Sequence, residues 1–350
     1  MDAVEPFEMR RPRVNKPLEL TILPSVSPVT PLLDVRHLVV SYPTPQGPVY
    51  AVRDVSFRIA PGEILALVGE TGCGKSTLAL SLLGLTDRGR QIESGEIFFE
   101  GCDIPALGAQ QWRRIRGGKI GMVFQDPRSA LNQVLSVGEH LIETLRAHQD
   151  LTRRQAWRRS VELLAEVGFP DPELNMRRYP FQLSGGMCQR LGIALGICNR
   201  PALLIADEPT SGLDPSIQQQ ILELLKHMTE SYRLALLLIS HDLPMLAGLA
   251  DRVAVMYHGR LIEAGTAAEV FNQPAHPYTR ALLECLPTLR HRADRGPLPQ
   301  ISGTPPVPSQ ELPGCAFAPR CPLAEDQCTR SLPPALPLSE THWAACIKAE

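Results

Sequence analysis

The sequence predicts an α/β fold with a mixed sheet, an antiparallel β subdomain and a helical subdomain. A short apolar run, Ile64–Val68, leads directly into a glycine-rich loop and a helix, and similar runs at 202–206 and 234–239 end in polar residues. Short apolar runs bounded by turn signals are typical of buried parallel strands. Alternating apolar residues over 32–60 predict antiparallel strands on one side of this core.

Composition sets broad limits on the function. The 350 residues suffice for one large domain or two smaller ones, and the formal net charge of -2 provides no global basic field for nucleic acid. The longest apolar runs, such as 234–239, fall far short of the ~20 residues that a membrane-spanning helix needs. We therefore expect a chain that does not cross a bilayer by itself.

The first 31 residues are rich in proline and lack the apolar stretch of a secretory signal. We interpret residues 1–31 as a disordered or loosely docked extension. A chain without a signal is expected in the cytosol, where thiols stay reduced, so the nine cysteines do not indicate a disulfide framework.

The glycine-rich loop at 69–77 reads Gly-Glu-Thr-Gly-Cys-Gly-Lys-Ser-Thr. It fits the pattern G-x-x-x-x-G-K-[ST], in which backbone N–H groups surround a phosphate at a helix N-terminus. The alternative is a turn that merely joins strand to helix. The pattern predicts that Lys75 neutralises the β- and γ-phosphates and that Ser76 binds Mg²⁺. The candidate nucleotide-contacting residues are Gly69, Glu70, Thr71, Gly72, Cys73, Gly74, Lys75, Ser76 and Thr77.

Strands and a helix are expected on either side of this loop. A Pro/Gly-rich turn at 43–48 separates the strands within 32–60, a helix is predicted over 76–85, and further strands over 95–101 and 120–124. Tyr42 lies at the end of the first strand. It could stack on an adenine ring, or be an ordinary strand-end tyrosine.

Gln125 directly follows the strand at 120–124. A glutamine at the edge of a nucleotide site can orient the attacking water or ligate Mg²⁺, whereas alone it would be a polar strand end. The segment 136–178 then shows helical periodicity. Its arginines have no interleaved aromatic residues, so we interpret them as a solvated helix face and not as a nucleic-acid groove.

A second phosphate-binding helix N-terminus is predicted at Ser184-Gly185-Gly186, which opens a helix running to about residue 198. A nucleotide has only one γ-phosphate. The second site therefore suggests a nucleotide held by another subunit, which argues for a dimer.

The apolar runs at 202–206 and 234–239 end in residues suited to hydrolysis. Asp207 can hold the hydration shell of Mg²⁺, and Glu208 can polarise a water for in-line attack. Asp214 follows in a turn. His241 ends the second run and would lie near the γ-phosphate.

Two strand-like pieces at 253–257 and 260–263 follow, and then helices near 267–271 and 278–286. From residue 287 the chain becomes proline-rich, so a large packed core is not expected there. Four cysteines gather in this part. Both Zn²⁺ and a [4Fe–4S] cluster use four thiolates, and the gaps of five, six and seventeen residues lack the paired C-x₂₋₄-C spacing usual for structural zinc. Free thiols or disulfides remain a further alternative. The residues concerned are Cys315, Cys321, Cys328 and Cys346.

Six motifs in fixed order make the chain similar to the ATP-binding-cassette (ABC) ATPases: the phosphate loop, Gln125, the Leu-Ser-Gly-Gly signature, the Asp207-Glu208 pair, Asp214 and His241. The resemblance implies a P-loop NTPase cassette over 32–272, with the helical subdomain at about 127–190, and a C-terminal extension over 273–350. It further implies a head-to-tail dimer with two ATPs at the interface.

The resemblance also implies individual roles. Tyr42 would stack on adenine, Glu208 would be the catalytic base, His241 would contact the γ-phosphate, and Ser76, Gln125 and Asp207 would hold Mg²⁺. Ser184, Gly185, Gly186 and Asp214 would contact nucleotide. Cys188 replaces the Arg or Gln more frequent at that signature position, with little effect expected on the ATP contact.

Within the family, two segments resemble the ATPase subunits of oligopeptide, dipeptide and nickel importers: residues 123–132 and the His-Pro-Tyr-Thr-Arg-Ala-Leu segment at 276–282. The cysteine pattern resembles that of the D-type peptide importers, which favours a [4Fe–4S] cluster over Zn²⁺. The implied partners are a second, related cassette, two membrane permeases and, indirectly, an extracytoplasmic binding protein, with the chain on the cytoplasmic face of the membrane. A soluble ABC ATPase acting on nucleic acid or ribosomes is the alternative, against which the near-neutral charge argues.

Overall fold

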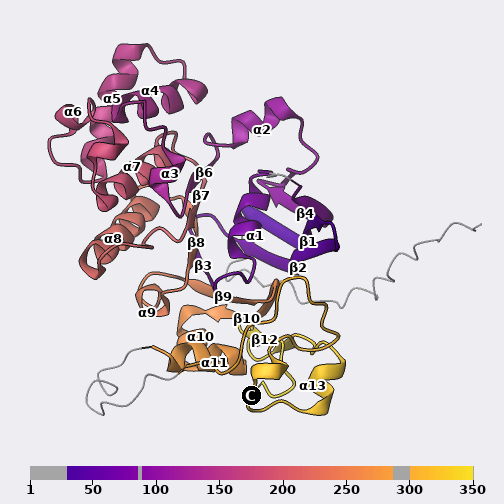
Figure 1. Cartoon of the computed structure of the whole chain (residues 1–350). Helices are drawn as coiled ribbons and strands as arrows, with labels where there is room; N and C mark the ends of the chain where they lie inside the picture. Colours follow the sequence, from indigo (N-terminus) through magenta and orange to yellow (C-terminus); the bar gives the residue numbers. More distant parts are fainter. Residues whose placement is uncertain (1–29, 86–88, 287–299, 350) are drawn as a thin grey trace, which may run out of the picture.

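The computed structural model describes residues 30–85, 89–286 and 300–349. Almost all of the predicted N-terminal extension, 1–31, therefore lies outside the described residues. The rest confirms the predicted α/β class, with two sheets and a separate block of helices (Figure 1).

The larger sheet has eight strands in the order β11-β12-β10-β9-β3-β8-β7-β6. Its centre is parallel, because β3 pairs in parallel with β8 and β9, and β7 pairs in parallel with β6 and β8. The remaining pairs are antiparallel. The strands are β3 Ile64–Val68, β6 Ile120–Val123, β7 Leu203–Asp207, β8 Ala235–Ser240, β9 Arg252–Tyr257, β10 Arg260–Thr266, β11 Leu336–Pro337 and β12 Trp343–Ala344.

The smaller sheet is antiparallel, with the strand order β2-β1-β4-β5. It confirms the two strands predicted within 32–60. The strand predicted over 95–101 starts earlier than expected, at Gln91, because residues 91–94 also pair with β1. The strands are β1 Leu33–Thr44, β2 Gly47–Ile59, β4 Gln91–Phe99 and β5 Cys102–Asp103.

The helical block lies at one end of the larger sheet (Figure 1). Hydroxyl side chains cap its main helices: Ser136, Thr152 and Ser184 each accept a hydrogen bond from a backbone N–H in the first turn. The block comprises α3 Pro127–Ala130, α4 Val137–His148, α5 Arg153–Glu166, α6 Pro172–Asn175, the 3₁₀ turn η1 Pro180–Gln182 and α7 Gly185–Ile197.

The other helices cover the sheets or follow them in the chain. They are α1 Lys75–Leu82, α2 Ala109–Ile115, α8 Pro215–Tyr232, α9 Leu243–Leu246, α10 Ala267–Asn272, α11 Pro277–Glu284, η2 Ala318–Arg320 and α13 Asp326–Arg330. None of the helices in the described ranges is long and apolar enough to cross a membrane.

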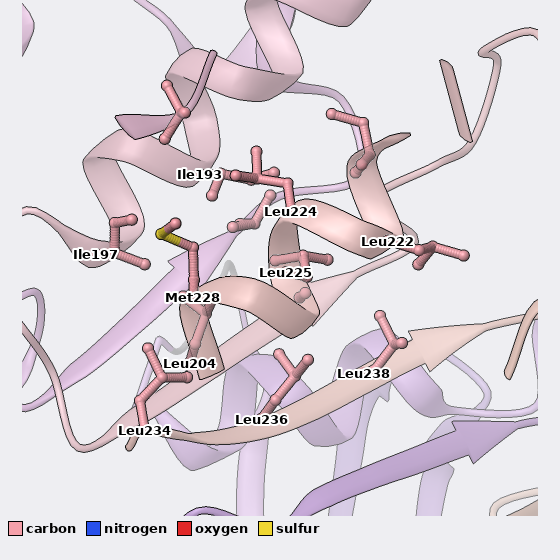
Figure 2. Packing of buried hydrophobic residues seen from close by; sticks show 14 of the residues in the cluster. Ile193, Ile197, Leu204, Leu222, Leu224, Leu225, Met228, Leu234, Leu236 and Leu238 are labelled. Atoms are coloured by element: carbon pink, nitrogen blue, oxygen red, sulfur yellow. The ribbon is translucent and has the colours of Figure 1, made fainter. Parts of the chain in front are cut away.

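Two apolar clusters form the core. One of them joins the helical block to the larger sheet: Ile193 and Ile197 of α7 and Leu225 and Met228 of α8 pack over Leu236 of β8 (Figure 2). The position of α7 is therefore fixed against the strands whose ends carry the candidate site.

The C-terminal extension is more closely joined to the cassette than the sequence predicts. Its strand β12 pairs with β10 and so extends the larger sheet. Trp343 is buried in one apolar cluster and Phe317 in the other. His342 contacts the fully buried carboxylate of Glu263 at 2.8 Å. Through Phe317 and Trp343, the described part of the extension therefore shares the apolar clusters of the cassette.

Candidate active site

The loop after β3 requires glycine at two positions. Gly69 has φ 155°, and a Cβ there would lie 2.2 Å from the Met256 carbonyl oxygen. Gly74 caps the N-terminus of α1 with φ 111°, where a Cβ would lie 2.2 Å from the Ala51 carbonyl oxygen. Since a side chain would displace backbone at both places, these glycines hold the loop close to its neighbours. This geometry favours a phosphate-binding loop over a simple connecting turn.

The Lys75 side chain is buried and turned back over the loop. Its Nζ donates to the carbonyl oxygens of Gly69 at 2.7 Å and Glu70 at 3.0 Å. The ammonium therefore lies inside the curve of the loop, where a phosphate would meet it. One backbone donor is already used, because the N–H of Glu70 donates to the Tyr278 hydroxyl at 2.8 Å. The expected contact of Glu70 with nucleotide through this N–H is thus not available in this conformation.

Tyr42 lies beside the first helix after the loop. Its hydroxyl contacts Thr77 Oγ1 at 3.0 Å and accepts a hydrogen bond from Arg90 Nε at 3.0 Å. The Arg90 guanidinium also lies 5.4 Å from the centre of the Tyr42 ring. These contacts fix a partly buried aromatic ring at the edge of the loop, where an adenine could stack on it.

Asp207, at the end of β7, is buried beside Ser76. Burial raises the pKa of its carboxyl, and a hydrogen bond with Ser76 partly opposes that rise. Its Oδ1 has no hydrogen-bond partner among the described residues. A buried carboxylate oxygen without a donor, next to a serine hydroxyl, fits the oxygen ligands that Mg²⁺ prefers.

Three polar residues from three strand ends come together at Glu208. Gln125 Nε2 donates to Glu208 Oε2 at 2.8 Å, and His241 Nδ1 lies 3.5 Å from Glu208 Oε1. The Glu208 side chain is 11% exposed, and the residue has φ 45°, a left-handed conformation rare for a non-glycine residue. The strand ends thus assemble a glutamine, a carboxylate and an imidazole next to Asp207.

The predicted signature forms the exposed N-terminus of α7. Ser184 caps the helix by accepting a hydrogen bond from the Met187 N–H at 3.3 Å, and Gly185 is exposed beside it. Asp214 caps α8 in the same way, accepting from the Ile217 N–H at 3.2 Å. The start of α7 is thus an exposed helix N-terminus, the kind of place where backbone N–H groups can bind an anion.

Cys188, the unusual signature residue, points away from this surface. It is fully buried, and its Sγ donates to the Pro180 carbonyl oxygen at 3.6 Å. Burial raises the pKa of its thiol. The substitution leaves the exposed face of the signature unchanged.

The four C-terminal cysteines line one small, largely apolar pocket together with His276 and Phe317. All four are free thiols. Within the described ranges, however, no three His, Cys, Asp or Glu side chains are grouped closely enough to hold a metal ion. The structure therefore provides no Zn²⁺ site at these thiols, and the expected metal binding is not supported at this point. The four residues are Cys315, Cys321, Cys328 and Cys346.

One residue near the loop is absent from the sequence predictions. Arg320, in the C-terminal extension, donates to both carboxylate oxygens of Glu70, at 2.6 and 3.0 Å. These residues are 250 positions apart. Arginine commonly pairs with carboxylates through two hydrogen bonds. This preference does not identify which carboxylate Arg320 contacts, so the sequence could not predict the pair.

Comparisons with known proteins match two parts of the chain to known families. Residues 52–211 match the family described as "ABC transporter". Residues 262–328 match the family described as "Oligopeptide/dipeptide transporter, C-terminal region". The first match covers the loop and β7, and the second ends at Cys328.

Individual relatives are similar over almost their whole length. A putative peptide import ATP-binding protein of Brucella abortus is 45% identical over 303 residues, covering 87% of this chain and 91% of the relative. The dipeptide transport ATP-binding protein DppD of Bacillus subtilis is 44% identical over 316 residues, covering 90% and 94%. Among solved structures, the dimeric post-hydrolysis state of the ATP-binding cassette MJ0796 bound to ADP and Pi matches with a TM-score of 0.61 and 25% identity, over 67% of this chain and 98% of that one.

Proposed function

The chain belongs to the ABC transporter family and carries its ATPase domain, and we propose that it is the ATP-hydrolysing subunit of an importer that takes up oligopeptides or dipeptides through partner permeases. Uptake of nickel or another solute by an importer of the same family is the alternative. The observation that carries the ATPase chemistry is the convergence of Gln125, Glu208 and His241 beside a phosphate-binding loop.

Binding and orientation of ATP fall to the loop and Tyr42. The loop N–H groups and the Lys75 ammonium neutralise the phosphates, and the Tyr42 ring stacks on the adenine. Ser76, Asp207 and Gln125 would hold Mg²⁺, which would supply electrostatic stabilisation of the charge on the phosphoryl group.

Hydrolysis requires a base and a sensor for the γ-phosphate. Glu208 accepts a hydrogen bond from Gln125 and contacts His241, so its carboxylate is held at one place at the strand ends. From there it can polarise the attacking water, while His241, which is 59% exposed at its side chain, contacts the γ-phosphate.

A second cassette completes the site. The exposed N-terminus of α7, at Ser184, Gly185 and Gly186, supplies donors to a nucleotide held by the partner's loop. Asp214, at the start of α8, lies at the same interface. We propose that the partner is a related cassette, so that the pair is a heterodimer, closed by ATP binding and opened by hydrolysis.

The permeases dock on the helical block. Among the described residues, five large apolar side chains remain exposed on this block or at its start, at 38–78%. Apart from Leu174 of α6, they lie in two segments, 124–134 and 179–181, that the chain folds together. The Val137 N–H donates to the Arg178 carbonyl oxygen, and Arg128 donates to that of Leu183, joining the segment after β6 to the segment before α7. We define this apolar docking surface as Phe124, Val134, Tyr179 and Phe181.

Figure 1 shows this block at the end of the larger sheet that carries β6, and Gln125 follows β6 closely in the chain. Exposed apolar groups of this kind mark surfaces that bind another protein. Phe124 belongs to the docking surface and immediately precedes Gln125 of the proposed nucleotide site. A change at the γ-phosphate would therefore move the docking surface and the permease helices bound to it. The chain would then lie on the cytoplasmic face of the membrane, and an extracytoplasmic binding protein would deliver solute to the permeases.

Val134→Glu tests the docking surface. Val134 is 78% exposed, so the charge costs little stability but opposes docking. We expect the variant to bind ATP normally and to lose the co-purified permeases. Val307→Glu, at 59% exposure in the C-terminal extension, is the matched control. Unchanged recovery of the permeases with Val134→Glu would exclude this surface.

We also propose that the four C-terminal thiols hold a [4Fe–4S] cluster. A Zn²⁺ ion needs all four sulfurs about 2.3 Å from one point, whereas a cluster of four irons spreads its thiolate ligands further apart. Four cysteines that line one pocket but form no single-ion group are compatible with the wider arrangement. The cluster would cross-link a segment that is rich in proline and poor in apolar residues.

Anaerobic purification with iron, sulfide and zinc analysis tests the cluster. Iron and sulfide in a ratio near one, without zinc, support it. Zinc without iron, or protein free of both metals, would overturn it.

Co-purification and ATPase assays test the function itself. The importer predicts recovery with two membrane permeases and ATPase activity that rises with peptide and binding protein. Activity stimulated by nucleic acid, without membrane partners, would instead indicate the soluble class of ABC ATPase. Stimulation by nickel and not by peptide would indicate the metal importers.

A further inference from the structure

The C-terminal extension contacts Glu70 of the phosphate-binding loop through an ion pair with Arg320 and a hydrogen bond with Tyr278. Arg320 donates through Nη1 to Glu70 Oε2 at 2.6 Å and through Nη2 to Glu70 Oε1 at 3.0 Å. The Arg320 side chain is 4% exposed and the Glu70 side chain 25%. A bidentate, largely buried pair of this kind fixes the direction of the carboxylate as well as its charge.

Arg320 is itself held by its surroundings. Its Nε donates to the Ser302 carbonyl oxygen at 3.0 Å, and its Nη1 also donates to the Tyr257 hydroxyl at 3.1 Å. The guanidinium lies 5.9 Å from the centre of the Phe317 ring. These contacts leave the guanidinium little freedom, so the arginine sets the position of Glu70 and not the reverse.

Glu70 is the residue of the loop that could oppose nucleotide binding. It directly follows Gly69, and its own carbonyl oxygen accepts a hydrogen bond from the Lys75 ammonium at 3.0 Å. A carboxylate free to turn toward Lys75 would compete with the phosphates for that ammonium and would repel them. In the structure both carboxylate oxygens are instead occupied by Arg320.

We propose that Arg320 is a positioning residue for ATP binding: it neutralises Glu70 and holds that carboxylate away from the phosphates. The Tyr278 hydroxyl, which accepts from the Glu70 N–H at 2.8 Å, fixes the backbone of the same residue. The extension therefore completes the nucleotide site of its own cassette. This inference rests on ATP binding at the loop, and not on the identity of the transported solute.

A thermodynamic cycle with Arg320→Gln, Glu70→Gln and the double variant tests this role in the full-length chain. The measurement is the affinity for Mg-ATP by equilibrium titration. We expect Arg320→Gln to weaken ATP binding about tenfold when Glu70 is present and less than about threefold when Glu70 is replaced by Gln, because contacting residues couple strongly. The turnover number at saturating ATP should change little.

The cycle separates positioning from a structural role. If Arg320 only supported the extension, its replacement would weaken binding equally with and without Glu70, and that result would overturn the inference. Normal ATP affinity of Arg320→Gln would do so too. A wild-type chain that bound no ATP would overturn this inference and the proposed function together, whereas ATP binding by the wild type with no effect of Arg320→Gln would overturn this inference alone.

Two further variants guard against simple loss of folding. Arg320→Lys keeps the charge but loses the bidentate geometry, so its affinity should lie between those of the wild type and Arg320→Gln. Arg330→Gln is the matched control, since it breaks an exposed ion pair with Asp326 in the same extension. It should leave the affinity and the unfolding temperature unchanged.

Discussion

Glu208 has a constrained environment in the candidate site. Its backbone is left-handed at φ 45°, and its N–H donates to the Ile239 carbonyl oxygen at 2.9 Å. Strained backbone persists where the surroundings determine it fully, and such positions concentrate at functional sites. The carboxylate then meets Gln125 and His241 from two other strand ends. These contacts hold the carboxylate at one position between the strand ends.

Glu208→Gln should keep ATP binding and lose turnover. The amide has the same shape and can still contact Gln125 and His241, but it cannot accept a proton from water. We expect kcat to fall by about 10² to 10⁴-fold, the usual contribution of a general base. ATP titration and phosphate release measure the two effects separately. Normal hydrolysis by this variant would exclude Glu208 as the base.

The contact between β6 and α7 positions two parts of the site at once. β6 leads into Gln125, and α7 begins with the signature. The two elements meet at glycines: a Cβ on Gly121 would lie 2.0 Å from the Gly196 carbonyl oxygen. The close approach of strand and helix therefore depends on the missing side chain.

Gly121→Ala should destabilise the chain by about 1–3 kcal/mol, because the added methyl group overpacks a contact with backbone that cannot move aside. Denaturant unfolding measures the change. Gly248→Ala is the control, since no atom of the described residues lies within 4 Å of a Cβ there. It should alter stability by less than about 0.5 kcal/mol. If the two variants had equal free energies of unfolding, β6 and α7 could move apart without a loss of stability.

Elements whose residues show a strong local pattern, such as an apolar run or a helix cap, could be predicted from the sequence. The serine cap of α7 and the strand β3 lie at the expected residues, and β7 and β8 lie within one residue of them. The proximity of Gln125, Glu208 and His241 could be predicted in the same way, because parallel strands bring their carboxyl ends to one edge of a sheet. The sequence did not predict β12, because a two-residue strand in a proline-rich segment has no period to recognise. The Arg320–Glu70 pair was missed for a related reason: 250 residues separate its members, and only the tertiary fold relates them.

In the proposed dimer, each hydrolytic site combines the loop of one chain with the signature of the other. The variant Gly185→Asp tests whether the signature serves the partner's nucleotide. The residue is exposed, and a Cβ there meets only Leu213 Cδ2, at an ordinary 3.4 Å. A carboxylate at a helix N-terminus favours the helix, so α7 should remain folded. It should, however, repel the γ-phosphate of a nucleotide held by the partner.

We therefore expect Gly185→Asp to bind ATP at its own loop with normal affinity and to show normal thermal stability. In the assembled complex, ATP turnover should fall by about 10²-fold, comparable to the loss of a donor that stabilises transition-state charge. The measurements are ATP titration of the isolated chain and phosphate release by the complex. Undiminished turnover would show that the signature does not serve the partner's nucleotide, and weakened binding by the isolated chain would show that it serves its own.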